Sequence, residues 1–253
     1  MSNSKVIALF NQSGGVAKTT LTMNLGYQLA QRQHRVLLVD MDPQASLTAF
    51  MGLEPSELAE TIYESLMVGE TLPIHSDIYQ MDLLPANINL SGAELELVVA
   101  DLRDLRLVEA LKPGRERYDF ILIDCPPSLG ILSYISLVAA THVLIPIQTE
   151  YKALKGTELL LQTLARVKKR ANQELQVAGI LPTMYDGRTV QAAQSLQSIT
   201  ESLSEIARVY PPLTRSIAFA DAAQQHQPLA VYNPKHPALK ILTEVAQGLE
   251  ALP

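Results

Sequence analysis

The sequence predicts an α/β fold, a three-layer sandwich with a mostly parallel central sheet. Six segments have the composition of strands, and most of them are apolar throughout. Helical segments alternate with them, which is typical of a parallel sheet that is buried on both faces. A fold of this class binds its ligand at the carboxyl ends of the strands. The predicted strands are 5–11, 35–39, 78–85, 118–123, 141–147 and 177–182.

Helices are expected at 18–33 and 57–68, and from 91 to about 111. Pro113 and Gly114 are expected to break the last of these, because proline and glycine interrupt helices. The chain has no internal repeat, no low-complexity tract and no linker-like stretch. We therefore expect residues 1–253 to form a single domain.

The composition excludes several classes of protein. Hydrophobic residues make up 47% of the 253 residues, which is enough for a sizeable core. Cys125 is the only cysteine, so one chain can form neither an internal disulfide nor an all-cysteine metal site. No apolar run reaches the roughly 18 residues of a membrane span. The first residues lead directly into a strand without a signal-peptide pattern. A cytoplasmic protein is expected.

The charge is distributed unevenly along the chain, whose net charge is −6. Residues 54–109 contain twelve acids against Arg103 and Arg106, whereas 151–170 contain six bases against Glu158. An acidic protein of this kind can still present a basic face to a polyanion.

The segment 11–20 reads as a phosphate-binding loop between the first strand and the first helix. Gly14 and Gly15 allow the backbone to curl, so that N–H groups at the helix N-terminus point toward an anion. Lys18 can reach the β- and γ-phosphates, and Thr19 offers a hydroxyl to Mg²⁺. Thr20 offers a second hydroxyl, to the α-phosphate. The loop departs from the ordinary pattern because Gln12 and Ala17 stand where glycines are usual.

These residues resemble the deviant Walker A loop of the ParA/MinD family of P-loop ATPases. The segment 39–44 resembles the first switch of that family, and 123–130 its Walker B strand and second switch. The segments 147–151, 183–188 and 212–216 continue the likeness in the family's order. The resemblance implies a P-loop NTPase fold that binds ATP and Mg²⁺. The implied nucleotide-binding residues are Gly14, Gly15, Val16, Ala17, Lys18, Thr19, Thr20, Met184 and Pro212.

The same resemblance assigns roles to acidic residues at two strand ends. Asp42 would polarise the attacking water, and Lys18 would neutralise phosphate charge. Asp40, Asp124 and Thr19 would surround the magnesium ion. The alternative for Asp40 is a cap of the following turn or helix. Gly130 would let the second switch move as the γ-phosphate comes and goes.

The family's second loop lysine is replaced here by Ser13. In the resemblance that lysine crosses a dimer interface to the partner's nucleotide, which a serine cannot do. Lys152 follows the strand 141–147 at its carboxyl end and is long enough to take over this role. The alternative is a solvated lysine at a helix start. Serine in the loop together with this lysine resembles the cyanobacterial branch of the family that positions carboxysomes.

A basic cluster near the end of a predicted helix is a candidate for non-specific DNA binding, because Lys and Arg contacts to phosphates supply such affinity. The alternative is that these bases only complement the helix dipole. Ala218 stands where many DNA-binding relatives carry an arginine. The tail 241–253 has no base, which argues against a membrane anchor. The candidate DNA-binding residues are Arg166, Lys168, Lys169, Arg170, Arg188 and Arg215.

Together these features predict an ATPase that binds the nucleoid non-specifically as an ATP-bound homodimer. It would distribute a cargo, carboxysomes by the resemblance, and an adaptor protein on the cargo would stimulate hydrolysis. One alternative is a ParA-type ATPase that partitions a chromosome or plasmid. Another is an ATP-binding structural protein that no longer hydrolyses ATP, to which Ser13 and Ala17 point.

Overall fold

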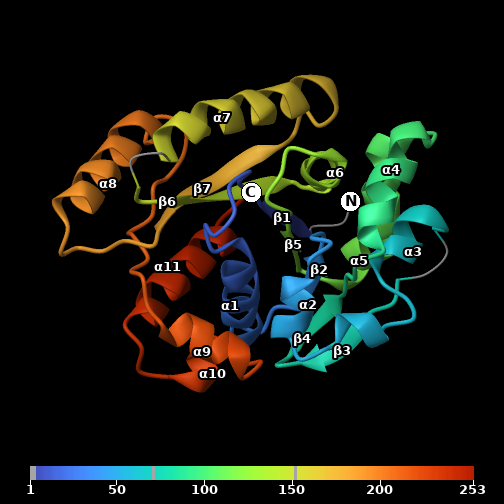
Figure 1. Cartoon of the computed structure of the whole chain (residues 1–253), viewed down its shortest axis with the longest axis horizontal. Coiled ribbons are helices and arrows are strands. Elements are labelled where there is room, and N and C mark those ends of the chain that lie inside the picture. The colour runs from blue at the N-terminus through green and yellow to red at the C-terminus, as the bar shows by residue number, and fades with distance from the viewer. Residues whose placement is uncertain (1–3, 70–71, 151–152) are drawn as a thin grey trace.

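A computed structural model describes residues 4–69, 72–150 and 153–253. The described residues form a seven-stranded sheet in the order β3-β4-β2-β5-β1-β6-β7 (Figure 1). Its strand pairs are parallel, except that β3 runs antiparallel to β4. The strands are β1 (Lys5–Leu9), β2 (Val36–Asp40), β3 (His75–Ile78), β4 (Met81–Leu84), β5 (Phe120–Asp124), β6 (His142–Gln148) and β7 (Gln176–Thr183).

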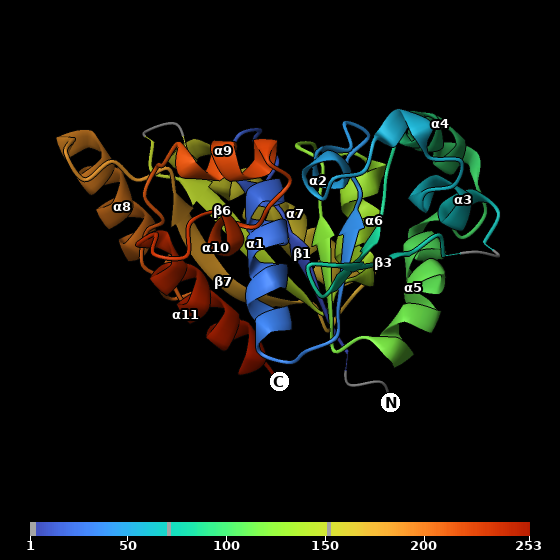
Figure 2. The same cartoon turned by 90° about the horizontal axis from the view of Figure 1, so that it is seen from below.

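Helices cover both faces of the sheet, which confirms the predicted three-layer sandwich (Figures 1 and 2). One face packs against α3 (Ile62–Met67), α4 (Leu90–Val99), α5 (Arg106–Arg117), α6 (Ile131–Ala139), α7 (Ala153–Arg170) and α8 (Val190–Leu203). The other packs against α1 (Lys18–Gln31), α2 (Ser46–Phe50), α9 (Ala218–Gln224), α10 (Leu229–Tyr232) and α11 (Ala238–Glu250). Two short 3₁₀ turns, η1 (Pro55–Glu57) and η2 (Arg103–Leu105), complete the described elements.

The continuous apolar strands are explained by burial on both sides. In β1, Val6 and Ala8 belong to one hydrophobic cluster, while Ile7 and Leu9 belong to the other. Successive side chains of a strand point to opposite faces, so a strand between two helical layers needs apolar residues at every position.

Three local predictions were wrong. The segment 57–68 is not one helix, because Glu57 ends η1 and α3 begins only at Ile62. A capping box of Thr61 and Glu64 starts α3. The segment 78–85 contributes the end of β3 and then β4, which pair as a hairpin. The stretch from 91 to 111 breaks after Val99, and α5 then continues through Pro113 to Arg117. A proline in a helix removes one hydrogen bond, and here tertiary packing of α5 outweighs that cost.

The register of the sheet brings three strand ends to one level. Leu9 of β1 and Asp40 of β2 both pair with Asp124 of β5, one from each side. Asp40 and Asp124 are therefore neighbours at the carboxyl edge, directly beside the loop that follows β1. This edge is where a parallel α/β sheet binds ligands.

Within the described residues, no helix has both the length and the hydrophobicity to span a bilayer.

The buried Tyr210 ring packs against Gly179 and Gly248, and its contact with Gly248 leads to a stability prediction. A methyl group at Gly248 of α11 would overlap the Tyr210 hydroxyl and lie 2.9 Å from its Cζ. Gly248→Ala is expected to lower the free energy of unfolding by about 1–3 kcal/mol, because a rigid buried ring must shift. Chemical denaturation measures this change in the free energy of unfolding.

Gly92→Ala is the matched control for this prediction. Gly92 also lies inside a helix, but a methyl group there would approach only the Glu96 Oε1 atom, at 3.7 Å. This variant should gain up to about 1 kcal/mol from helix propensity. Equal stability of Gly248→Ala and the parent would contradict the packing argument.

Candidate functional site

The loop between β1 and α1 has the backbone curl that the sequence predicts. Gly15 has a φ of 72° and Ala17 a φ of 73°, both in the left-handed region. Glycine adopts this region freely, whereas an alanine pays roughly 1–2 kcal/mol. Ala17 therefore keeps the glycine-type conformation in spite of its side chain. The loop must be held in shape by the rest of the protein.

Hydrogen bonds from the strand ends hold the loop. The Asn11 Nδ2 donates to the Pro146 carbonyl at 2.7 Å, and the Gln148 Nε2 donates to the Gly15 carbonyl at 2.7 Å. The Thr183 hydroxyl donates to the Val16 carbonyl at 3.2 Å. β6 and β7 thus fix the loop that follows β1. Asn11 belongs to the loop, and Gln148 and Thr183 lie in segments that the family resemblance includes, but their spacing along the chain does not indicate that they hold the loop in shape.

Lys18 lies inside the loop rather than in solvent, since it is only 7% exposed. Its ammonium donates to the carbonyls of Asn11 at 2.9 Å and Ser13 at 3.0 Å. Burial lowers the pKa of Lys18, and the nearby Asp124 carboxylate opposes that shift. A positive charge therefore lies inside the loop, beside the Asn11 and Ser13 carbonyls. Ser13, Gly14 and Gly15 are exposed at its mouth.

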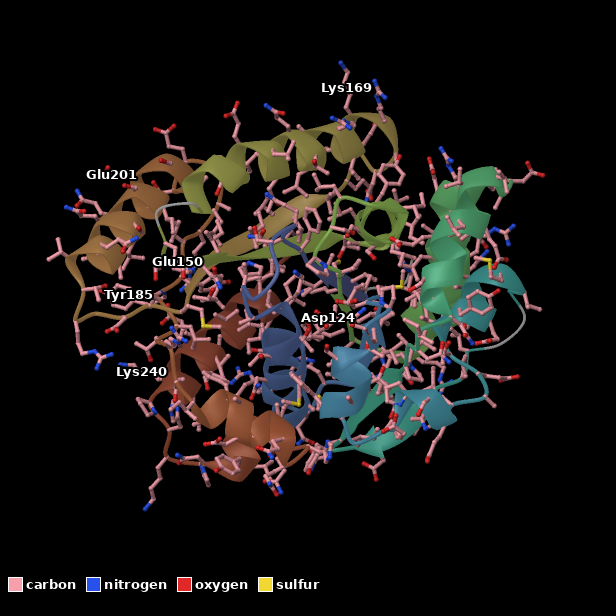
Figure 3. The ribbon with its side chains drawn as sticks, viewed as in Figure 1. Asp124, Glu150, Lys169, Tyr185, Glu201 and Lys240 are labelled. Carbon is pink, nitrogen blue, oxygen red and sulfur yellow. The ribbon has the colours of Figure 1, made fainter. Side chains whose placement is uncertain are left out.

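Asp124 is fully buried, and among the described residues its carboxylate oxygens have no well-formed hydrogen bond, although the Thr19 hydroxyl is close enough to act as a donor toward them (Figure 3, centre). Burial and the adjacent Asp40 raise the pKa of Asp124 well above its usual range, while Thr19 and Lys18 act in the opposite direction. A buried carboxylate with so little hydrogen bonding is costly unless a cation lies beside it. Oxygen ligands of this kind suit Mg²⁺. Asp124 and the Thr19 hydroxyl fit the ion that the sequence predicts.

Asp40, in contrast, is already engaged by the protein. Its Oδ1 accepts the Asp42 N–H at 3.1 Å, and its Oδ2 accepts the N–H and hydroxyl of Thr48 at 2.9 and 2.8 Å. Burial raises the pKa of Asp40 to about 6, although these bonds oppose the rise. The contacts favour a cap of the following segment. Magnesium ligation by Asp40 stays a prediction.

Asp42 lies two residues beyond the end of β2 and is partly exposed. Its Oδ1 accepts the Gln44 N–H at 3.0 Å. The carboxylate is close enough to Lys18 and Asp124 to influence the pKa of each of them. It therefore combines access to solvent with closeness to the loop, which an acid that orients a water molecule requires.

The second switch follows Asp124. Cys125 is buried, and burial together with the Asp124 charge raises the pKa of its thiol to about 12, which agrees with a packing role. Gly130 begins α6 with an ordinary φ of −72°. A side chain there would meet the Glu94 Oε1 of α4 at 3.0 Å. This atom is the end of a flexible side chain that can move aside, so packing against α4 does not by itself require glycine at this position.

Met184 and Pro212 lie on two joined segments beyond β7. Met184 follows Thr183, the residue bonded to the loop, and has a φ of 54°. The Leu213 N–H donates to the Pro182 carbonyl at 2.8 Å, which brings Pro212 to the same edge. Nucleotide contact by either residue stays a prediction.

Lys152, the predicted replacement for the loop lysine, lies outside the described residues.

The six candidate DNA-binding residues form two separate groups. Arg166, Lys168, Lys169 and Arg170 are exposed at the end of α7. This end lies at the amino edge of the sheet, where Lys168 borders a hollow with the first residues of β6 and β7. Arg188 and Arg215 lie at the carboxyl side, beside Asp186 and Tyr185 respectively. Figure 3 shows Lys169 and Tyr185 at different ends of the molecule.

Arg188 forms a two-point ion pair with Asp186, at 2.8 and 2.7 Å. This pair lowers the pKa of Asp186 to about 2.

Among the described residues, no group of three or more His, Cys, Asp or Glu side chains is arranged to hold a metal ion.

Comparisons with known proteins agree with this geometry. Residues 4–177 match the family described as AAA domain. The sporulation initiation inhibitor protein Soj of Bacillus subtilis is 38% identical over 98% of this chain and 98% of its own length. The chromosome partitioning protein ParA of Myxococcus xanthus is 39% identical over 91% of this chain and 82% of its own.

Solved structures are similar over the whole fold. A Mycobacterium smegmatis protein described as cobyrinic acid a,c-diamide synthase is 34% identical, with a TM-score of 0.84 and coverage of 96% of this chain and 92% of its own. A variant of McdA from Cyanothece, in complex with ATP, is 26% identical, with a TM-score of 0.88 and coverage of 100% and 98%. The phosphate loop, the acidic strand ends and these relatives agree, and the chain belongs to the ParA/MinD family of ATPases.

Proposed function

We propose that this chain binds ATP with Mg²⁺ at the loop 11–20, hydrolyses it, and uses the ATP-bound state to position a cargo on DNA. The observation that carries the proposal is the buried Asp124 carboxylate, which has no well-formed hydrogen bond among the described residues and lies near Lys18 and the Thr19 hydroxyl. Two similar structures support it by their descriptions. One is the McdA variant with ATP, and the other is a Mycobacterium smegmatis protein with ADP and magnesium.

Each group of the site has a separate role in the proposed reaction. The loop N–H groups and the α1 dipole receive the phosphates, and the Lys18 ammonium exchanges the Asn11 and Ser13 carbonyls for phosphate oxygens. Asp124 and Thr19 hold Mg²⁺, which neutralises phosphate charge when bound. Asp42 orients the attacking water. Asp40 keeps Asp42 and Thr48 in place through its three hydrogen bonds.

The acid beside the loop argues against a structural protein that binds ATP without hydrolysing it. Ala17 retains the left-handed backbone that the loop needs, and Lys18 is already inside the loop, which supports ATP binding under either alternative. Asp42 is partly exposed and lies close enough to Lys18 and Asp124 to influence their pKa values. Its position supports retention of hydrolysis, in spite of Ser13.

Two substitutions separate binding from turnover. Lys18→Ala should abolish detectable ATP binding in isothermal titration calorimetry, because the chief counter-charge of the phosphates is lost. Asp42→Ala should keep the affinity for ATP and lower the hydrolysis rate by about 10²–10⁴-fold, the usual loss for a proton-handling acid. Glu205→Ala, an exposed acid outside the site, is the control. Normal hydrolysis by Asp42→Ala would show that another group orients the water.

The DNA-binding surface is proposed to include both basic groups in an ATP-bound homodimer. The relatives that partition chromosomes support DNA as the polyanion. Each group gives a chain only a small patch, and doubling the patches in a dimer raises the affinity through effective concentration. The proposed surface is Arg166, Lys168, Lys169, Arg170, Arg188 and Arg215.

ATP-bound protein should bind DNA without sequence preference, and the affinity should fall steeply with salt. Charge reversal of Lys168, Lys169 and Arg170, or of Arg188 and Arg215, should weaken binding and flatten the salt dependence. ATP binding should be unchanged. Fluorescence anisotropy with two unrelated duplexes measures this. Lys112→Glu, just beyond the acidic segment 54–109 and outside both basic groups, is the control. If both reversals leave the affinity unchanged, the proposed surface is wrong.

Lys152 is proposed to replace the missing loop lysine across the dimer. Lys152→Ala should leave ATP binding by the monomer intact, because Lys18 remains, and should impair ATP-dependent dimerisation in analytical ultracentrifugation. Ser13→Lys in the Lys152→Ala background should restore the dimer, since it returns a positive charge to the loop. Lys155→Ala is the control. A Lys152→Ala protein that dimerises like the parent would exclude this role.

The cargo is proposed to be the carboxysome, with an adaptor on it that stimulates hydrolysis. Ser13 in the exposed part of the loop and the similarity to McdA over the whole chain support this assignment. The higher identity to Soj and ParA favours the alternative, a chromosome or plasmid. Deletion of the gene separates the two by which cargo loses its even distribution in the cell.

A further inference from the structure

A glutamine of the phosphate loop is joined to helix α7. The Gln12 Nε2 donates to the Gly156 carbonyl, in the first turn of α7, at 2.6 Å. The same carbonyl is the helical acceptor of the Leu160 N–H, because each carbonyl of an α-helix accepts the N–H four residues on. Other side-chain bonds join the loop to β6 and β7, whereas this one joins it to a helix.

The bond to Gly156 decides how the Gln12 amide is oriented. An amide nitrogen donates and an amide oxygen accepts, so only the Nε2 atom can face a carbonyl. The Oε1 atom is buried and has no hydrogen-bond partner among the residues that the structure describes. A buried amide oxygen without a donor is unfavourable. Among these residues, the Gly156 carbonyl is therefore the polar contact that holds the Gln12 side chain in place.

Lys18 holds the loop backbone on both sides of Gln12. Its ammonium donates to the carbonyl of Asn11, the residue before Gln12, at 2.9 Å. It also donates to the carbonyl of Ser13, the residue after Gln12, at 3.0 Å. In the proposed reaction Lys18 exchanges both carbonyls for phosphate oxygens. ATP would therefore release the backbone on either side of the residue that is bonded to α7.

Helix α7 is long enough to carry a change from one edge of the sheet to the other. Its 18 residues span about 27 Å. It lies on one face of the sheet, with Lys169 near the end that is remote from the loop (Figures 1 and 3). Leu160, Leu164 and Val167 are buried, while the last three residues of the helix are exposed bases. A packed helix slides as a unit, so a shift of its first turn also moves its basic end.

We infer that Gln12 is a positioning residue that makes α7 follow the occupancy of the phosphate loop. When Lys18 leaves the two carbonyls, Gln12 moves with the loop backbone and shifts the first turn of α7 through Gly156. The rest of the helix follows. The inference rests on the proposed function in one respect, since it requires ATP to bind at the loop. A Gln12 that only supported the shape of the loop would leave α7 unchanged when the nucleotide binds.

The test follows the Leu160 amide by NMR hydrogen exchange in the full chain, because its acceptor is the Gly156 carbonyl. Samples with and without Mg²⁺ and a non-hydrolysable ATP analogue are compared. The protein concentration is one at which ultracentrifugation gives a monomer, so that a dimer contact cannot protect the helix. Calorimetry establishes the analogue concentration that saturates each protein.

In the parent, the analogue should slow the exchange of the Leu160 amide about two- to tenfold, the effect of one strengthened hydrogen bond. The exchange slows because phosphate contacts stiffen the loop to which Gly156 is bonded. The analogue should also shift the amide resonances of Lys168 and Lys169, at the basic end of α7.

Gln12→Met keeps the length of the side chain and removes the donor. This variant should lose both effects of the analogue, because the loop is no longer bonded to α7. Gln162→Ala is the matched control, since Gln162 is an exposed glutamine of α7 whose Nε2 donates to Glu158 of the same helix at 3.2 Å. Both effects should persist in the control.

Gly156→Ala tests the same bond from the helix side. A methyl group there would lie 3.1 Å from the Gln12 Nε2, so the flexible amide must give way by a few tenths of an ångström. The variant should reduce both effects of the analogue. In the Gln12→Met background it should cause no further change, because the bond that it disturbs is already absent.

Three results would overturn the inference. They are undiminished effects of the analogue in Gln12→Met, undiminished effects in Gly156→Ala, and a parent that binds the analogue without a change at Leu160 or at the basic end. The last result would leave the proposed function intact. If Gln12→Met does not bind the analogue, Gly156→Ala, which lies outside the loop, decides. A parent that does not bind the analogue in calorimetry would refute the proposed function as well.

Discussion

Two carboxylates lie side by side in the buried carboxyl ends of β2 and β5, and the site is arranged around them. Asp40 and Asp124 are in register and fully buried. Placing two acids in an apolar sheet is costly. Asp40 raises the pKa of Asp124, and Asp124 raises the pKa of the Cys125 thiol. Thr48 and the Asp42 N–H satisfy Asp40, whereas Asp124 has no well-formed hydrogen bond among the described residues and depends on Lys18, the Thr19 hydroxyl and a cation.

The loop beside these acids is shaped by its neighbours rather than by its own residues. Ala17 adopts a glycine-type conformation because hydrogen bonds from β6 and β7 hold the loop from the other side. β6 and β7 therefore fix the shape of the loop that follows β1. This rigidity keeps the N–H groups preorganised for an anion, so that little reorganisation is needed when the phosphates arrive.

Two regions of the molecule differ in charge. The region around α3, α4 and α5 is acidic, while the end of α7 carries four exposed bases. The end of α7 lies at the amino edge of the sheet, whereas the loop 11–20 lies at the carboxyl edge. This arrangement lets a polyanion approach the basic end of α7 without facing the acidic region.

The sequence by itself determined the layers of the fold and the chemistry of the site. Apolar strands alternating with helices predicted the parallel sheet, because a strand buried on both faces leaves no polar position. The order of glycines, Lys18, Thr19 and the acidic strand ends predicted a phosphate site, because residues close together in the sequence form such a loop. Only the tertiary structure decided how α5 passes Pro113, which strands support Ala17, that Asp40 is engaged by Thr48, and that the basic residues form two groups. Each of these depends on contacts between segments far apart in the chain, and the packing that brings them together leaves no local pattern.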